Sequence, residues 1–282
     1  MTAIFFQSVS SNTWLMSVYI FGISHFLLAT YYSRHKITSA LSNSKHYFAL
    51  APLALLGLAS YTTSFSLVLY FGLHHALSEA YLVQRKVGAS LNEQSMMTLQ
   101  TSRFFMQLSG YILLVRNDPF FRIEQLNSLA LIVFVLSSLV FVWQMWRASD
   151  NLSLHQLIKL FYSEAMLFLF LLLSLAFPIT FLQVVFYHYT FWAILPFLNF
   201  SIHNKKHIKP AVIYTLLTVI SIIVLIKVSP LHHPTSTRYF RFEYWFVLQS
   251  YLHITLSFAT SNANPGWLIA LFNRSPKAVA KV

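Results

Sequence analysis

The feature that most constrains the fold is a series of long apolar stretches, one of which carries histidines near its middle. The stretch 64–83 is almost continuously apolar, and a helix of that length, rising 1.5 Å per residue, can cross a hydrocarbon core of about 30 Å. It contains His74, His75 and Glu79, and a helix places His75 and Glu79 one turn apart on the same face. Because a membrane interior offers no water to polar atoms, ionisable side chains there indicate a metal, a proton path or a ligand.

The composition places the chain among integral membrane proteins. Of its 282 residues 57% are hydrophobic and only 9% are charged, whereas about a quarter of the residues of a soluble domain are charged. We therefore expect an all-α, polytopic membrane helix bundle in which residues 1–282 form one integral membrane domain. The chain has no cysteine, which excludes disulfides, iron–sulfur clusters and thiolate metal sites. It also has no phosphate-binding loop and no nucleophile motif, so phosphoryl transfer and hydrolysis lack support.

About nine membrane spans are expected from the apolar windows. The second window is short, and Pro178 is taken as a boundary within residues 158–200, which are almost continuously apolar. The expected spans are 14–32, 47–61, 64–83, 96–115, 126–146, 158–177, 181–200, 211–228 and 242–263.

The distribution of basic residues predicts the orientation of these spans. With the N-terminus outside, the loops on the inner side hold thirteen Lys and Arg, and the outer side holds five. Basic loops face the cytoplasm, so the N-terminus is expected outside and the C-terminus inside, in the inner membrane of a bacterium. The basic residues of these loops account for the net charge of +12, so the charge does not indicate binding of nucleic acid. The expected partner is the lipid bilayer.

Histidines recur at mid-depth in several of the expected spans. All of these spans run from outside to inside, so their histidines share one layer. Neutral imidazole is a favoured ligand of iron, copper and zinc, and glutamates accept hydrogen bonds from ligating imidazoles. The alternative is that each histidine bonds to a polar group on a neighbouring helix. The histidines are His25, His74, His75, His188 and His253, and the glutamates are Glu79, Glu164 and Glu243.

A second histidine pattern follows the seventh span. His203-Asn-Lys-Lys-His207 has i, i+4 spacing, which stacks two rings on one helix face, as two ligands of one metal require. The alternative is a basic helix end that contacts lipid phosphates.

Three short motifs resemble the Brp/Blh family, which are membrane β-carotene dioxygenases of bacteria and archaea. Gly22-Ile-Ser-His25-Phe-Leu-Leu-Ala29 is similar to a Gly-Ile-Pro-His-Gly-Ala motif. It keeps the glycine, the isoleucine and the histidine, but lacks the small Gly-Ala pair after the histidine and the acidic residue that follows this pair. His74-His75-Ala-Leu-Ser-Glu79 is similar to Tyr-His-Phe-Gly-Glu, with one extra residue and without the glycine. His203-Asn-Lys-Lys-His207 is similar to His-Ser-x-Arg-His.

The resemblance implies a non-haem iron site and an oxidative reaction. His25, His75, His203 and His207 would then be the ligands of Fe²⁺, and the substrates would be O₂ and a hydrophobic isoprenoid, most simply β-carotene cleaved to retinal. His203 lies about four turns beyond His188 along the chain. Either the seventh span begins later than expected, or His188 is the ligand in its place, with His74 and His253 as further alternates.

A non-catalytic role is the competing hypothesis. Paired histidines on helices also ligate haem, and His188 with His253 could do so. The chain would then be a haem- or quinone-associated subunit or a small transporter.

Overall fold

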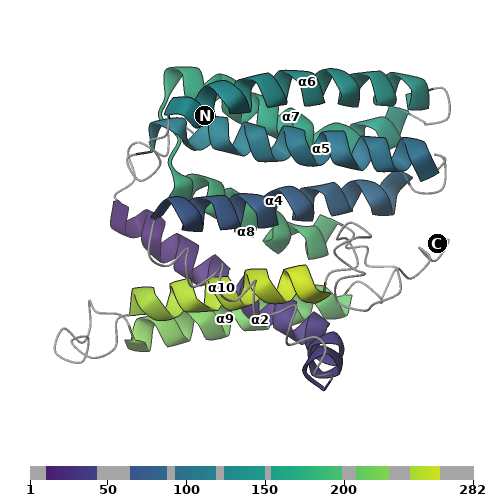
Figure 1. The fold of residues 1–282 in the computed structure, drawn as a ribbon. Coiled ribbons are helices and arrows are strands. Elements are labelled where there is room, and N and C mark those ends of the chain that lie inside the picture. Colours follow the sequence, from purple (N-terminus) through teal and green to yellow (C-terminus); the bar gives the residue numbers. More distant parts are fainter. Residues whose placement is uncertain are drawn as a thin grey trace. The chain divides into compact units, whose positions relative to one another are not determined.

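The described part of the chain is entirely helical in the computed structural model. It comprises residues 11–42, 64–87, 93–118, 124–149, 154–198, 208–228 and 242–260, and no strand occurs within it. Figure 1 shows the described helices coloured in the order in which they follow one another along the chain. They are α2 (Ser11–Leu41), α4 (Ser64–Val87), α5 (Glu93–Leu114), the 3₁₀ turn η1 (Val115–Asn117), α6 (Glu124–Ser149), α7 (Leu154–Ala176), α8 (Phe181–Leu198), α9 (Ile208–Val228) and α10 (Phe242–Thr260).

Proline marks two of the helix boundaries. Helix α7 ends at Ala176 and α8 begins at Phe181, on either side of Pro178. Proline has no N–H to donate and disfavours helical backbone in the residue before it, so the long apolar run divides there as expected. In α9, Pro210 lies in the first turn, where the missing N–H has no helical partner in any case.

The all-α prediction is confirmed for the described residues, and eight of the expected spans coincide with helices. The expected span 47–61 lies outside the described residues. By length and composition, one described helix is long and apolar enough to cross a membrane, namely Leu126–Arg147 in α6. Shorter apolar segments occur at Met16–Tyr31, Tyr162–Ala176 and Ala211–Val224. Helices α4 and α5 are continuous, but polar residues interrupt their apolar stretches.

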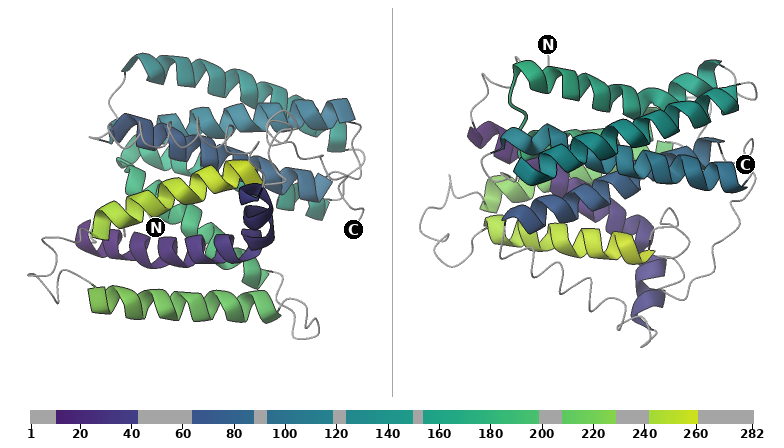
Figure 2. Two further views of the ribbon diagram at one scale, coloured as in Figure 1. Left: turned by 60° about the horizontal axis from the view of Figure 1, so that its bottom comes forward. Right: turned by 45° about the horizontal axis from the view of Figure 1, so that its top comes forward.

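The chain divides into two compact units. The first consists of Met1–Ser44 and Phe181–Leu256, and the second of Lys45–Thr180 and Ser257–Val282. In the first unit α2 packs against α8 and α9, and aromatic rings join it to α10. Figure 2 shows α9 running alongside α2. This unit contains His25, His188 and His253.

The second unit is built around α5. Helices α4, α6 and α7 all contact α5, and α4 also contacts α7. The four helices run side by side in Figure 1. Its buried core includes Tyr70, Met106 and Tyr111, and the Tyr111 hydroxyl donates a 2.9 Å hydrogen bond to the Val68 carbonyl. This unit contains His74, His75, Glu79, Arg103 and Glu164.

Candidate metal centre

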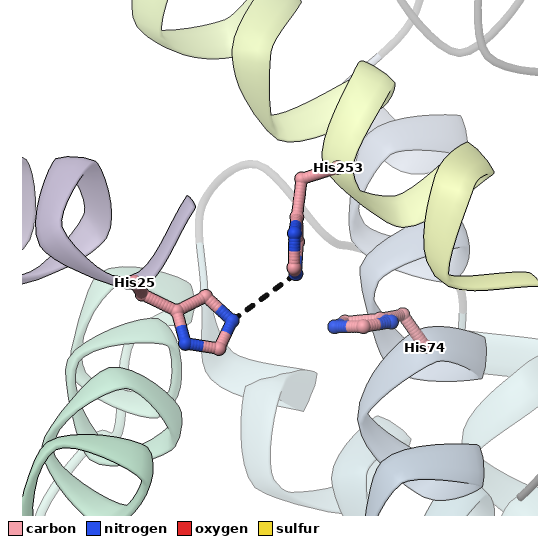
Figure 3. A group of neighbouring side chains, drawn as sticks. All are labelled: His25, His74 and His253. Carbon is pink, nitrogen blue, oxygen red and sulfur yellow. Dashed lines mark hydrogen bonds between the residues drawn. The ribbon is translucent and has the colours of Figure 1, made fainter. Parts of the chain in front are cut away.

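Three imidazoles from three helices come together in the first unit. His25 lies on α2, His188 on α8 and His253 on α10; the first two are buried and the third is half-buried. The Nε2 atoms of His25 and His253 are 3.1 Å apart, joined by the dashed line in Figure 3. The His25 ring centre lies 4.7 Å from that of His253 and 5.4 Å from that of His188. We call these residues the histidine cluster.

Aromatic side chains surround the cluster. The Tyr189 ring centre lies 5.3 Å and the Trp192 ring centre 6.2 Å from that of His25. The Phe26 ring centre lies 5.1 Å from that of His253. Because Phe26 and Tyr189 are themselves buried, the imidazoles lie in apolar surroundings with little access for water. Such surroundings suit a site that acts on a hydrophobic molecule.

Small residues on α2 allow the helices to approach at this point. A Cβ atom on Gly22 would lie 2.6 Å from the Phe246 ring and 2.9 Å from the Tyr189 ring, so only glycine fits without displacing α10 or α8 side chains. Two residues later, Ser24 Oγ lies 3.2 Å from Ser221 Oγ on α9. The residues around His25 thus bring α2 close to three other helices.

The geometry of the pair is compatible with metal binding. Two nitrogen ligands held at about 2.1 Å from one metal, at tetrahedral or right angles, lie about 3.0–3.4 Å apart. The 3.1 Å separation of the two Nε2 atoms falls in that interval, and these imidazoles could hold a metal ion. The same distance also fits a hydrogen bond in which one imidazole donates to the other.

The histidines of α4 lie in the second unit. His74, His75 and Glu79 are all buried, as expected for mid-helix residues at this position. The His75 ring is parallel to the Phe71 ring, with centres 6.2 Å apart, and lies 6.1 Å from the Tyr111 ring. Figure 3 also draws His74, which belongs to this unit. The role of His74 or His75 as a metal ligand stays a prediction.

Arg103 is a buried charge that the sequence interpretation did not consider. It lies on α5 with a side chain only 2% exposed, and its Nε donates to Oε1 of Glu164 on α7. Glu164 thus has an arginine as its partner, whereas the sequence predicted a role beside a ligating histidine. The available signal was an arginine inside the expected span 96–115, since an arginine at such depth is rare and marks a functional or paired position.

The remaining predicted residues are outside the part of the chain that the structure describes. His203 and His207 precede α9 and Glu243 has no described side chain, so the choice between His188 and the His203/His207 pair stays a prediction. What the structure adds is that His188 lies beside His25.

Comparisons with family models, curated proteins and solved structures gave no match to this chain.

Proposed function

We propose that this chain is a polytopic membrane protein whose histidine cluster binds a metal ion, and that it cleaves a carotenoid oxidatively. The observation that carries the proposal is the 3.1 Å approach of His25 Nε2 to His253 Nε2, with His188 beside them and aromatic rings around them. These three residues lie far apart in the sequence and on three helices.

Exposed apolar side chains support the placement in a membrane. Helix α6 exposes apolar residues on most of its circumference, and soluble monomers rarely expose contiguous apolar patches of more than a few hundred Å². Lipid is the environment in which such a helix is stable without a protein partner on that surface. The exposed residues of α6 include Leu129, Leu131, Ile132, Val135, Leu136, Leu139, Val142 and Trp146.

Arginine–aromatic pairs support a position at the headgroups for two helix ends. The Arg34 guanidinium lies 4.3 Å from the centre of the Tyr31 ring, and that of Arg147 lies 4.7 Å from the centre of the Trp143 ring. Arginine and aromatic residues gather where helices leave the hydrocarbon core for the headgroups. Both arginines lie toward the C-terminal ends of their helices, α2 and α6. The basic-residue count assigns these helix ends to the cytoplasmic side, with the N-terminus outside and the C-terminus inside a bacterial inner membrane.

The resemblance of the motifs, and not the donor set, is the reason to propose iron among the possible metals. His25 and His253 offer neutral nitrogen ligands, which suit iron, copper and zinc alike. The motifs around His25 and His75 resemble those of iron-dependent carotenoid dioxygenases, which is the reason to propose Fe²⁺. A bound iron would supply the site at which O₂ is activated.

The protein's own residues would hold and shield the substrate. Phe26, Tyr189 and Trp192 offer flat aromatic surfaces against which a rigid polyene packs. In the overall reaction one C=C bond of the polyene breaks and each of its carbons takes one oxygen atom of O₂, so two carbonyl products form. Carotenoids partition into the hydrocarbon core, so their delivery requires no aqueous channel.

Metal analysis of the detergent-purified protein tests the proposal first. We expect bound iron in the wild type, a loss of at least about tenfold in metal affinity in His25→Ala and His253→Ala, and no change in the exposed His35→Ala control. If folded wild type binds no metal, the short nitrogen–nitrogen distance is a hydrogen bond between α2 and α10, and the cluster is structural.

The reaction is tested in a bacterium that makes β-carotene. Cells that express the protein should lose colour and accumulate retinal, and His25→Ala cells should keep their colour. Folded, iron-loaded protein that leaves the carotenoid intact, with no shortened product, would refute cleavage of this substrate while leaving the metal centre established.

A further inference from the structure

The second unit contains a buried polar cluster that takes no part in the proposed metal centre. Arg103 and Gln107 on α5 face Ser163 and Glu164 on α7, and all four side chains are buried. We infer that this cluster binds the hydroxyl group of an apolar alcohol, with Arg103 donating a hydrogen bond to its oxygen and Glu164 accepting a hydrogen bond from its O–H.

Hydrogen bonds within the cluster are unevenly distributed. Oε1 of Glu164 accepts from Arg103 Nε, from Ser163 Oγ at 3.1 Å and from Gln107 Nε2 at 3.4 Å. Arg103 Nη2 donates to Ser163 Oγ at 2.6 Å. Yet Arg103 Nη1 and Glu164 Oε2 are both buried and have no hydrogen-bond partner among the described residues.

This arrangement differs from the usual pairing of arginine with a carboxylate. Two parallel N–H···O bonds ordinarily use both carboxylate oxygens. Here the donors converge on one oxygen, so the ion pair keeps one open donor and one open acceptor. Leaving a buried charged group short of a hydrogen bond is costly, which indicates that another molecule completes the site.

The charges of the cluster select the kind of molecule. The guanidinium and the carboxylate neutralise one another, so an anion would be repelled by Glu164 and a cation by Arg103. A neutral group that both accepts and donates can satisfy the two open positions, and water and the hydroxyl group of an alcohol are the smallest groups that do so. Neighbouring buried residues on the same helices, Leu99, Met106 and Leu167, are apolar, so the body of the ligand is expected to be apolar.

Retinol is a suitable probe because it joins one hydroxyl group to an apolar, fluorescent body. Its methyl ether keeps the body and the acceptor oxygen but has no proton to donate. With full-length protein in lipid nanodiscs, and empty nanodiscs as the blank, we expect saturable binding of retinol. The ether should bind about tenfold to a hundredfold more weakly, because Oε2 of Glu164 stays unpaired.

A double variant separates binding from folding. Arg103→Met/Glu164→Leu replaces the ion pair with apolar side chains of similar size, an exchange that often leaves stability unchanged. This variant should unfold at a temperature close to that of the wild type and show no saturable retinol binding. Arg116→Gln, which removes a basic residue of η1 that lies outside the cluster, should bind as the wild type does.

Two results would overturn the inference. One is that the wild type fails to bind retinol saturably or binds retinol and its ether equally, a comparison that requires no variant. The other is that the folded double variant binds retinol as well as the wild type. In either case water completes the hydrogen bonds of Arg103 and Glu164, and the ion pair serves only to join α5 to α7.

Discussion

Replacing Gly22 with alanine tests whether the close approach of helices beside the histidine cluster matters. The added Cβ would lie 2.6 Å from a Phe246 ring carbon and 2.9 Å from a Tyr189 ring carbon. Favourable carbon–carbon contacts are at about 3.5–4.0 Å, so one of the rings must move by about 1 Å. Phe246 has little room, because its ring centre is already 4.7 Å from that of Tyr19 and 5.5 Å from that of Phe26.

Two effects of opposite sign determine the expected magnitude. Crowding a packed core costs about 1–3 kcal/mol, whereas alanine in place of glycine within a helix stabilises by about 0.5–1 kcal/mol. The crowding is the larger effect, so we expect Gly22→Ala to lower the free energy of unfolding by about 0.5–2 kcal/mol. Because Tyr189 and Phe246 both lie within ring contact of His25 or of its neighbour Phe26, metal affinity should fall as well.

Unfolding of the detergent-solubilised protein, followed by circular dichroism, gives the first quantity, and metal titration gives the second. Gly22→Ala/Phe246→Leu removes the obstructing ring and should recover part of the lost stability. Thr30→Ala, at an exposed position of the same helix, is the control for helix propensity and should change stability little. A Gly22→Ala protein that is as stable as the wild type, or more stable, would refute the packing argument.

Three further predictions concern the metal, the ion pair and the topology. Fe²⁺ added at 100 times its dissociation constant should raise the free energy of unfolding of the wild type by about 2.7 kcal/mol and should hardly change that of His253→Ala. The shift in unfolding temperature measures this difference, and equal shifts in the two proteins would argue against the site. Arg103→Met alone should lower the free energy of unfolding by about 3–5 kcal/mol, because it leaves the Glu164 carboxylate buried without its partner. The double variant with Glu164→Leu should have a free energy of unfolding close to that of the wild type. Chemical unfolding measures both, and losses that simply add would contradict this coupling. Reporter fusions should place the loop 34–46 in the cytoplasm, and a periplasmic signal there would reverse the topology.

The helices themselves could be predicted from the sequence because apolar length and proline are local signals. The expected spans 64–83 and 181–200 correspond to α4 and α8, and the break at Pro178 occurs where the missing N–H requires it. Helix ends were less accurate, since α2 extends to Leu41, well beyond the apolar stretch that predicted it. Polar residues can continue a helix whose backbone bonds are already satisfied within it.

The members of the histidine cluster could be named from the sequence but could not be grouped. His25, His188 and His253 were each recognised as polar residues at mid-depth, because helical rise converts position in the sequence into depth. Depth gives no information on which helices are neighbours. Contacts of α2 with α8 and α10 depend on side chains such as Gly22 and Phe246, more than two hundred residues apart in the chain.

Arg103 shows the same division between local and tertiary information. An arginine within one apolar helix and a glutamate within another are visible in the sequence, because each follows from spacing along a single segment. That Glu164 is the partner of Arg103, and that Nη1 and Oε2 stay open, is visible only when the helices are packed together. A buried charge requires an opposite charge within a few ångströms, and the packing of the helices determines which residue lies at that distance.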